Sequence, residues 1–292
     1  RRRPMRDPFK IDGPTCISFS GGRTSAYMLW RVLQSNGGGL PDEALVCFAN
    51  TGKEEEATLR FVQDCAEHWG VHISWVEYRS DAQGYALVDF ATASRDGEPF
   101  EAIIRKRNYL PNPVTRFCTS ELKIRTMHKF QRVHWEQKGM AQKDMEWDQF
   151  IGIRADEQRR VSKIRARGHS AESKNEIMCL PLADAGVTVQ DVGAFWEAQP
   201  FNLGLPTYNG RTLAGNCDLC FLKPASQVAS LIHEKPSRAV WWAKMEALAL
   251  ASKPSGAVFR SDRASYAAML HNDGAQIDFV TDEEAIACFC GD

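Results

Sequence analysis

The chain has 292 residues, 43% hydrophobic and 25% charged, with a formal net charge of −1. This balance is ordinary for a globular protein, and no apolar run approaches the roughly 20 residues that a membrane span needs. The length suits one large α/β domain, with or without an appendage. No signal-peptide pattern follows the first arginines, so we expect a cytoplasmic protein. Nine cysteines favour metal or thiol chemistry over a disulfide framework.

The first predicted elements are an apolar strand over residues 16–19 and a helix from residue 26, joined by a glycine-containing loop. The loop residues are Ser20, Gly21, Gly22, Arg23, Thr24 and Ser25. Paired glycines let backbone N–H groups approach an anion, and the positive end of the helix dipole points at the same place. The loop is therefore a candidate phosphate site, and a tight turn with a serine N-cap is the alternative.

A βαβαβ unit follows from the next segments. Apolar runs over residues 43–49 and 71–76 predict buried strands, and residues 54–69 carry the stripe of an amphipathic helix. Parallel sheets bind ligands at the carboxyl ends of their strands, so we expect the loops after Phe19, Ala49 and Val76 to share one crevice.

The rest of the chain is predicted as a fourth strand, several helices and an irregular connection. Residues 81–113 have poor periodicity, and an arginine-rich loop follows the strand at 147–153. The predicted helices cover residues 119–138, 188–197 with Thr188 as N-cap, 224–233, 236–251 and 263–271. The predicted organisation is a tail (1–13), a nucleotide-binding α/β domain (14–200) and a cysteine-containing, mostly helical region (201–292).

Positive charge is concentrated in two segments. Residues 103–132 contain eight Lys or Arg against one acid, Glu121, and residues 154–167 contain six against two acids. Solvated helix faces are one explanation. Two such clusters beside a candidate phosphate loop favour a polyanionic ligand, either a nucleotide or a nucleic acid.

Five motifs in this order resemble the phosphoadenosine phosphosulfate (PAPS) reductase family of the PP-loop, or adenine nucleotide α-hydrolase-like, superfamily. They begin at Ser20, Asn50, Arg116, Gly152 and Pro181, within residues 14–225. The resemblance implies a Rossmann-like parallel sheet flanked by helices, with a mainly helical C-terminal region. It also implies an enzyme of sulfur metabolism that reduces adenylyl sulfate (APS) to sulfite.

The resemblance implies a site for an adenine nucleotide, which is PAPS, APS or ATP. The nucleotide-binding residues it implies are Ser20, Gly21, Gly22, Arg23, Thr24, Ser25, Asn50, Thr51, Gly52, Glu54, Arg116, Gly152, Arg154 and Arg160. Lys123, Arg154 and Arg160 would face the anionic part of the ligand, which agrees with the charge distribution.

The second strong signal is the Cys217-x-x-Cys220 pair. Such a pair can chelate one edge of a metal site, act as a redox dithiol, or arise by chance. The resemblance implies a [4Fe–4S] cluster bound by Cys118, Cys217 and Cys220. The fourth ligand is then Cys179, Cys288 or Cys290, or none.

Two positions depart from the family pattern and keep other functions open. Thr24 replaces an Asp that in many ATP-cleaving relatives helps to organise Mg²⁺, and the tail carries Cys288 and Cys290 without the Glu and His of the reductases. We expect Cys290 or Cys288 as nucleophile, with Lys123 at the anion and a thiol as reductant. The alternatives are an ATP-dependent sulfurtransferase that thiolates a nucleic acid or small acceptor, and a nucleotide-sensing or nucleic-acid-binding module without catalysis.

Overall fold

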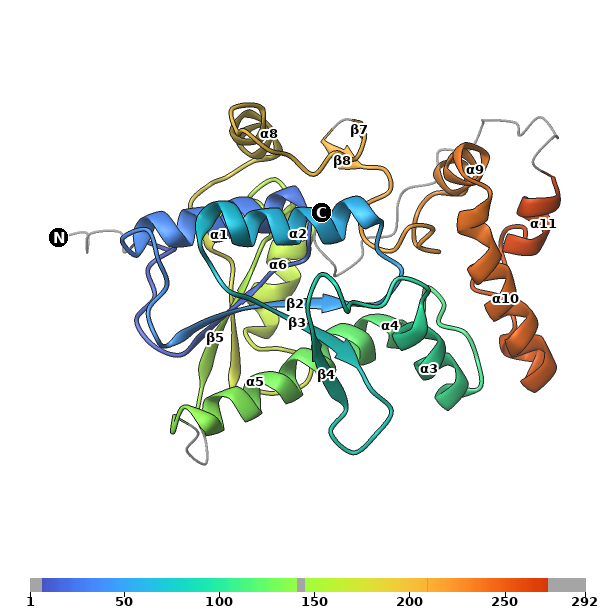
Figure 1. The fold of residues 1–292 in the computed structure, drawn as a ribbon, viewed down its shortest axis with the longest axis horizontal. Coiled ribbons are helices and arrows are strands. Elements are labelled where there is room, and N and C mark those ends of the chain that lie inside the picture. The colour runs from blue at the N-terminus through green and yellow to red at the C-terminus, as the bar shows by residue number, and fades with distance from the viewer. Residues whose placement is uncertain (1–6, 141–144, 209, 273–292) are drawn as a thin grey trace.

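The computed structural model describes residues 7–140, 145–208 and 210–272, and its centre is a six-stranded sheet with the order β4-β3-β2-β1-β5-β6 (Figure 1). The strands are β1 (Thr15–Ser18), β2 (Ala44–Asn50), β3 (Ile73–Tyr78), β4 (Tyr85–Val88), β5 (Trp147–Ile151) and β6 (Glu176–Cys179). Neighbouring strands are parallel except for the pair of β3 and β4. The α/β fold class and the βαβαβ order are thus confirmed.

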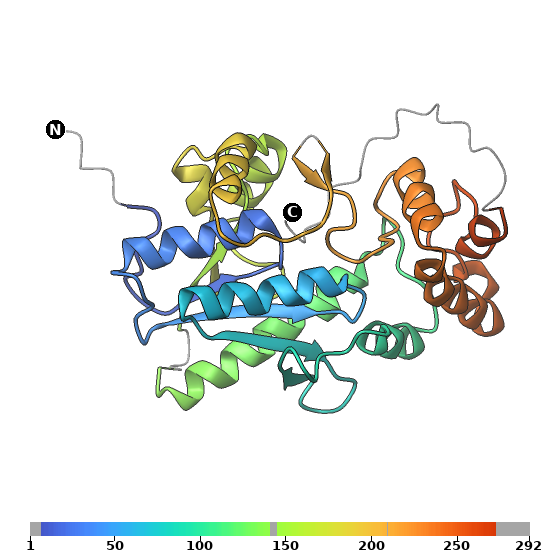
Figure 2. The same ribbon diagram turned by 45° about the horizontal axis from the view of Figure 1, so that its top comes forward.

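Helices cover both faces of this sheet because successive side chains of each strand point to opposite faces. Ile17 of β1 belongs to the core packed beneath α1 (Arg23–Ser35), α2 (Glu56–Trp69) and α8 (Val189–Glu197). Its neighbour Cys16 belongs to the opposite core, against α5 (Thr126–Gln137). Figures 1 and 2 show α1 and α2 on one side of the sheet and α5 on the other.

The strand order places a crevice beside β1. From β1 the chain moves outward through β2 and β3, then returns so that β5 pairs with the other edge of β1. The connection after β1 leads to β2 on one side, and the connection after β5 leads to β6 on the other side. Ligands of open α/β sheets bind where neighbouring connections diverge in this way. The 20–25 loop follows β1 at this place.

The structure corrects three predicted segments. The connection predicted as irregular over residues 81–113 contains β4 and the helix α3 (Glu98–Arg107), and the predicted arginine-rich loop is the helix α6 (Gln158–Arg167). Helix α6 has a narrow apolar side, with Val161 and Ile164 buried, which its many charges obscured in the sequence. The strand β6 was missed because only Glu176 of its four residues is fully buried.

The C-terminal region is helical, as predicted. It contains α9 (Ala225–Glu234), α10 (Ser237–Ser252), the short 3-10 turn η2 (Pro254–Gly256) and α11 (Tyr266–His271). Figures 1 and 2 place these helices, in orange to red, at one end of the molecule beside α3. Their apolar side chains form one core with α3, so a segment of the α/β half supports the C-terminal helices.

Smaller elements complete the described chain. They are α4 (Phe117–Thr119), the π-helical turn η1 (Ser120–Arg125), α7 (Pro181–Asp184) and the hairpin of β7 (Thr207–Tyr208) and β8 (Arg211–Thr212). Helix α8 begins with the predicted Thr188 cap, which pairs with Asp191 in a capping box. Within the described ranges no helix is long and apolar enough to cross a membrane. Cys288 and Cys290 lie outside the described residues.

Candidate functional site

The 20–25 loop is folded by its own serines. The Ser20 and Ser25 hydroxyls are 2.9 Å apart, the Ser20 N–H donates to Ser25 Oγ, and Ser25 Oγ donates to the Gly22 carbonyl. Gly22 precedes α1 in an extended conformation, and no side chain of the described residues caps this helix. The first N–H groups of α1 therefore have the geometry of an anion site.

Two glycines allow the loop to pack closely. Gly21 has φ +80°, and a Cβ there would lie 2.7 Å from the Thr58 methyl group. Gly152, just after β5, approaches the loop from the other side, where a Cβ would be 3.0 Å from the Ser25 Cα. A side chain at Gly21 would be strained by both the contact and the backbone conformation, and one at Gly152 would require the backbone at Ser25 to shift, which explains the two glycine motifs in physical terms.

An open cleft begins at this loop and runs down the α5 side of the sheet. Ser20, Ser25 and Gly152 are at its mouth. The other lining residues are Ser18, Phe19, Ala49, Thr119, Lys123, Ile124, Met127, Gln131, Gln149, Ile151, Arg167, Ser170, Ala171, Glu176 and Met178. The cleft thus begins at the carboxyl ends of β1 and β5, where the strand order favours a ligand site, and extends along the sheet to Gln149 and Glu176.

The arginines predicted to bind the nucleotide have different surroundings. Arg154 donates from Nη1 to Thr24 Oγ1 at 3.1 Å and from Nε to Asp156, so it is held beside the start of α1. Arg160 forms an ion pair with Glu157, and its buried Nη2 has no partner among the described residues. Arg116 donates from Nε to the Pro113 carbonyl and does not line the cleft.

Arg23 points away from the cleft and fastens the chain that crosses over α1. It donates to Asn202 Oδ1 and the Leu205 carbonyl, and also to the hydroxyls of Thr207 and Thr212 in the β7–β8 hairpin. Burial lowers the pKa of this guanidinium. Its described contacts are structural ones.

The motif after β2 lies on the far side of β1 from the cleft floor. Asn50 is fully buried and donates to Glu77 Oε1 at 2.6 Å, while its own oxygen accepts from the Gly52 N–H. Thr51 donates to the Glu54 carboxylate and lies 3.5 Å from Cys217 Sγ. This motif therefore joins β2 to the cysteine-containing segment.

A second, smaller cavity collects three of the predicted metal ligands. Cys118, Cys217 and Cys220 line it, together with Thr51, Phe100, Thr119, Leu122, Lys123, Asn216, Phe221, Leu222 and Trp242. Cys179 lies elsewhere, on β6, with its thiol directed to the Ile177 carbonyl. Cys16, Cys47 and Cys65 are buried in the sheet and α2, where burial raises the pKa of each thiol.

The three thiols have the donor chemistry of an iron–sulfur site, but they do not form a closed one. Thiolate sulfur is the usual ligand of such clusters. Within the described ranges, however, no three His, Cys, Asp or Glu side chains are close enough to hold a metal ion. The described residues by themselves therefore do not complete a cluster site.

Lys123 and Thr119 line both cavities, so the two spaces share a wall. Both residues belong to the segment in which α4 passes into the π-helical turn η1, where the Thr126 hydroxyl donates to the Glu121 carbonyl at 2.7 Å. Wide turns of this kind are frequent at functional sites. Lys123 Nζ is 3.8 Å from Glu54 Oε1, an ion pair that links this turn to the motif after β2.

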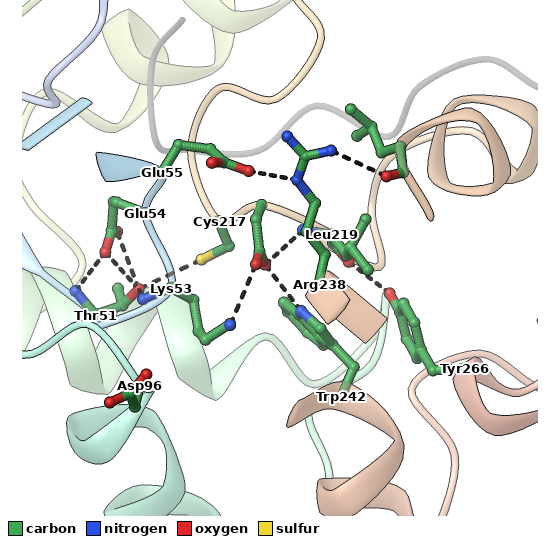
Figure 3. A network of polar contacts seen from close by, with 12 residues as sticks. Thr51, Lys53, Glu54, Glu55, Asp96, Cys217, Leu219, Arg238, Trp242 and Tyr266 are labelled. Carbon is green, nitrogen blue, oxygen red and sulfur yellow. Dashed lines mark hydrogen bonds and ion pairs between the residues drawn. The ribbon is translucent and has the colours of Figure 1, made fainter. Parts of the chain in front are cut away.

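The segment with both CxxC cysteines, here called the cysteine loop (residues 215–223), is held by cationic and phenolic donors. Lys223 Nζ donates to the carbonyls of Gly215, Cys217 and Asp218, and the Tyr266 hydroxyl donates to that of Leu219 at 2.6 Å. Arg263 donates to the carbonyls of Phe221 and Lys223. Figure 3 shows this loop between the motif after β2 and the C-terminal helices.

A buried ion pair that the sequence analysis missed fixes the cysteine loop to the sheet. Lys53 Nζ lies 3.2 Å from Asp218 Oδ2, both side chains are at most 10% exposed, and the Trp242 indole donates to Asp218 Oδ1 (Figure 3). Next to it, Arg238 of α10 is paired with Glu55. The only sequence signal was an Asp inside the CxxC pair.

The cleft floor was also missed. It contains Gln149 and Glu176, and the Glu176 carboxylate accepts from His128 Nδ1 at 2.8 Å. A glutamine inside the predicted apolar strand 147–153 was the available signal, since a buried amide needs a partner.

Comparisons with known proteins give relatives but no assigned activity. No family model matches the chain. An uncharacterized nin region protein of Escherichia phage lambda is 29% identical over 220 residues, which cover 73% of this chain and 67% of the phage protein. An uncharacterized protein of Methanocaldococcus jannaschii is 25% identical over 239 residues, covering 81% of this chain but only 42% of that protein.

Among solved structures, the chain is distantly similar to a PAPS reductase from Candida auris determined as a phosphate complex. The identity is 13%, the TM-score is 0.39, and the match covers 68% of this chain and 81% of the reductase. Because the two sequence relatives are themselves uncharacterized, the function has to be derived from the site of this chain.

Proposed function

We propose that this chain is an enzyme that binds an adenine nucleotide in the cleft and performs sulfur chemistry at the wall shared with the cysteine cavity. The observation that carries the proposal is the position of Lys123 and Thr119, which line both spaces. A phosphate or sulfate group on the 20–25 loop would be beside the Lys123 ammonium, and thiols would be available behind it. Charged groups in such a partly enclosed site stabilise developing negative charge more strongly than they would in water.

The reaction that this arrangement supports best is the reduction of adenylyl sulfate to sulfite. A cysteine thiolate attacks the sulfate sulfur, an S–S bond forms, and the bond from sulfur to the bridging phosphate oxygen breaks so that AMP leaves with its electron pair. A second thiol then attacks the cysteine sulfur, releases sulfite and leaves a disulfide. Lys123 would stabilise the departing phosphate. The proposed nucleophiles Cys290 and Cys288 lie outside the described residues. Cys217, which lines the cysteine cavity, is a further candidate in a protein without a cluster.

Product analysis tests this proposal directly. The protein is incubated with APS, PAPS or ATP in the presence of dithiothreitol, and sulfite, AMP and pyrophosphate are measured. We expect sulfite together with a stoichiometric amount of adenosine phosphate from one of the sulfonucleotides. Lys123→Met should lower the rate at saturating substrate, and Cys290→Ser, Cys288→Ser and Cys217→Ser should identify the nucleophile. Sulfite at the wild-type rate from all three cysteine variants would contradict the mechanism.

A bound [4Fe–4S] cluster is proposed separately, with Cys118, Cys217 and Cys220 as three of its ligands and any fourth ligand outside the described residues. It would give the anaerobically purified protein a brown colour and a stoichiometric iron content, and Cys118→Ser should remove both. Colourless, iron-free protein with full activity would exclude the cluster and leave the nucleotide proposal intact.

The second candidate is an ATP-dependent sulfurtransferase acting on a nucleic acid, which the position of α6 favours. Arg159, Lys163 and Arg165 are exposed on this helix, and Arg167 at its end lines the cleft. Cationic side chains beside a cleft suit a phosphate backbone. Pyrophosphate or AMP released from ATP only when RNA is added, without sulfite from APS, would select this function. Salt-sensitive RNA binding with no product from any nucleotide would select a binding module.

A further inference from the structure

The floor of the cleft contains a buried amide that the protein itself does not fully satisfy. Gln149 is only 5% exposed, it lines the cleft, and its Oε1 has no hydrogen-bond partner among the described residues. Buried side-chain polar atoms are nearly always paired, so an unpaired one in a cavity wall indicates a position where something else makes the bond. Gln149 lies on β5 opposite Cys16 of β1, well below the mouth of the cleft.

A second acceptor lies next to this amide. Glu176 of β6 is 3% exposed and also lines the cleft, and one of its carboxylate oxygens is occupied by His128. Strand pairing places Glu176 beside Trp147. Trp147 precedes Gln149 by two residues on β5, so Glu176 and Gln149 are on the same face of the sheet. A carboxylate has lone pairs for several donors. The floor therefore presents two oxygen acceptors to whatever enters.

The walls above the floor are apolar and face each other. Ile124 and Met127 contribute from η1 and α5, and Ile151 and Met178 contribute from the sheet. Apolar side chains on two sides suit the faces of a flat aromatic ring, and methionine sulfur contacts such rings favourably. From Cys16, level with Gln149, to Ser20 is four residues, or about 13 Å at the usual rise of a strand. An extended nucleoside phosphate has a comparable length.

We propose that the deep end of the cleft binds the base of the adenine nucleotide and that Gln149 and Glu176 select its exocyclic amino group. This inference rests on the proposed nucleotide site and adds its specificity. The adenine amino group has two N–H donors for the two oxygen acceptors, and a glutamine amide is a common partner of adenine. A base with a keto oxygen at that position, such as hypoxanthine, would place an acceptor against acceptors and leave Gln149 unpaired.

Calorimetric titration of the intact protein with ATP and with ITP tests the inference. We expect the wild type to bind ATP about tenfold more tightly than ITP, since this corresponds to one or two neutral hydrogen bonds. Gln149→Met, which keeps the volume and removes the acceptor, should weaken ATP binding about three- to tenfold and leave ITP binding nearly unchanged. Gln158→Met, an exposed glutamine on α6, is the matched control and should preserve the ratio.

A measurement without any variant covers the case in which Gln149→Met fails to fold. N6-methyl-ATP retains one donor and N6,N6-dimethyl-ATP retains none, so affinity should fall in two steps along this series. Binding of ATP with no preference over ITP, or an unchanged preference in folded Gln149→Met, would overturn the inference while the nucleotide site stands. Failure of the wild type to bind any adenine nucleotide would overturn the proposed function, and the inference with it.

Discussion

The 20–25 loop and the cysteine loop lie on opposite sides of one wall and differ in which of their backbone groups the protein itself satisfies. The 20–25 loop bonds within itself and leaves the start of α1 without a side-chain cap among the described residues. In the cysteine loop, by contrast, backbone carbonyls accept from Lys223, Arg263 and Tyr266. One loop offers N–H donors to a ligand, whereas the other has its acceptors satisfied by the protein. The first arrangement suits the anion-binding role proposed for the 20–25 loop, and the second suits a preorganised thiol loop.

The largest effect is expected when the buried ion pair that anchors the cysteine loop is broken. Asp218→Ala would leave the Lys53 ammonium buried without its partner, and we expect the free energy of unfolding to fall by about 3 to 5 kcal/mol. Urea denaturation followed by tryptophan fluorescence measures it. Asp218→Asn keeps an acceptor for Trp242 and separates the hydrogen bond from the charge. The double variant Lys53→Met with Asp218→Asn removes the buried charge and keeps an acceptor for Trp242, so it should recover most of the loss. A double variant as unstable as Asp218→Ala would contradict the ion-pair explanation.

The next effect is expected in the 20–25 loop. Gly21→Ala combines a left-handed backbone with a Cβ 2.7 Å from Thr58, so we expect a loss of roughly 2 to 4 kcal/mol together with weaker ATP binding. Thermal unfolding and calorimetry measure the two quantities. Gly37→Ala is the matched control, since Gly37 has φ +82° but a Cβ there would meet no atom within 4 Å. Equal effects of the two substitutions would mean that backbone conformation alone matters.

The stability of the C-terminal helices that hold the cysteine loop is expected to depend on pH. Burial raises the pKa of Glu246 from 4.5 to about 7, and Glu246 Oε2 accepts from the Tyr266 N–H. Because the folded state then holds a proton that the unfolded state has released, stability should fall as the pH rises from about 4.5 to about 7, by on the order of 2 to 3 kcal/mol. Glu246→Gln should flatten this dependence in urea titrations at several pH values. A slope unchanged by the substitution would assign it to other groups.

The smallest effect concerns the contact between Thr24 and Arg154. Thr24→Val preserves the shape of a side chain that is 3% exposed and removes one hydrogen bond, so we expect a loss of only about 1 kcal/mol. ATP affinity should change more than stability if Arg154 is thereby released from its position at the nucleotide. Arg165→Gln, which loses an exposed ion pair with Asp184, is the control for a change of surface charge. Equal ATP affinity in Thr24→Val and wild type would place Arg154 outside the site.

Much of the fold was predictable because its signals are local. The apolar runs of β1, β2, β3 and β5, the stripe of α2 and the capping box at Thr188 each occupy a few consecutive residues. The elements that were missed lack such signals. Helix α6 shows charge in place of a broad apolar stripe, and β6 is short and only partly buried. Their positions are set by packing against the rest of the sheet, and this long-range packing leaves no local pattern in the sequence.

The candidate site was predictable in its outline. The resemblance implied that Ser20, Ser25 and Gly152 share a site, and these three residues line one cleft. It also grouped Cys118 with Cys217 and Cys220, which share one cavity, whereas Cys179 lies apart. The resemblance gave no way to see that Arg23 holds a distant hairpin, because that contact joins residues more than 180 positions apart.

The sequence by itself determined the α/β class, the order of the first five elements and the glycine loop, because strand and helix periods and glycine conformations act between near neighbours. Only the tertiary structure decided which side chains share a cavity. Lys123 lies between the cleft and the cysteines, Gln149 Oε1 lies at the cleft floor without a partner among the described residues, and Lys53 reaches Asp218. Each of these arrangements depends on the strand order and joins residues that are more than a hundred positions apart in the sequence. A buried charge or amide finds such a distant partner only when the chain has folded.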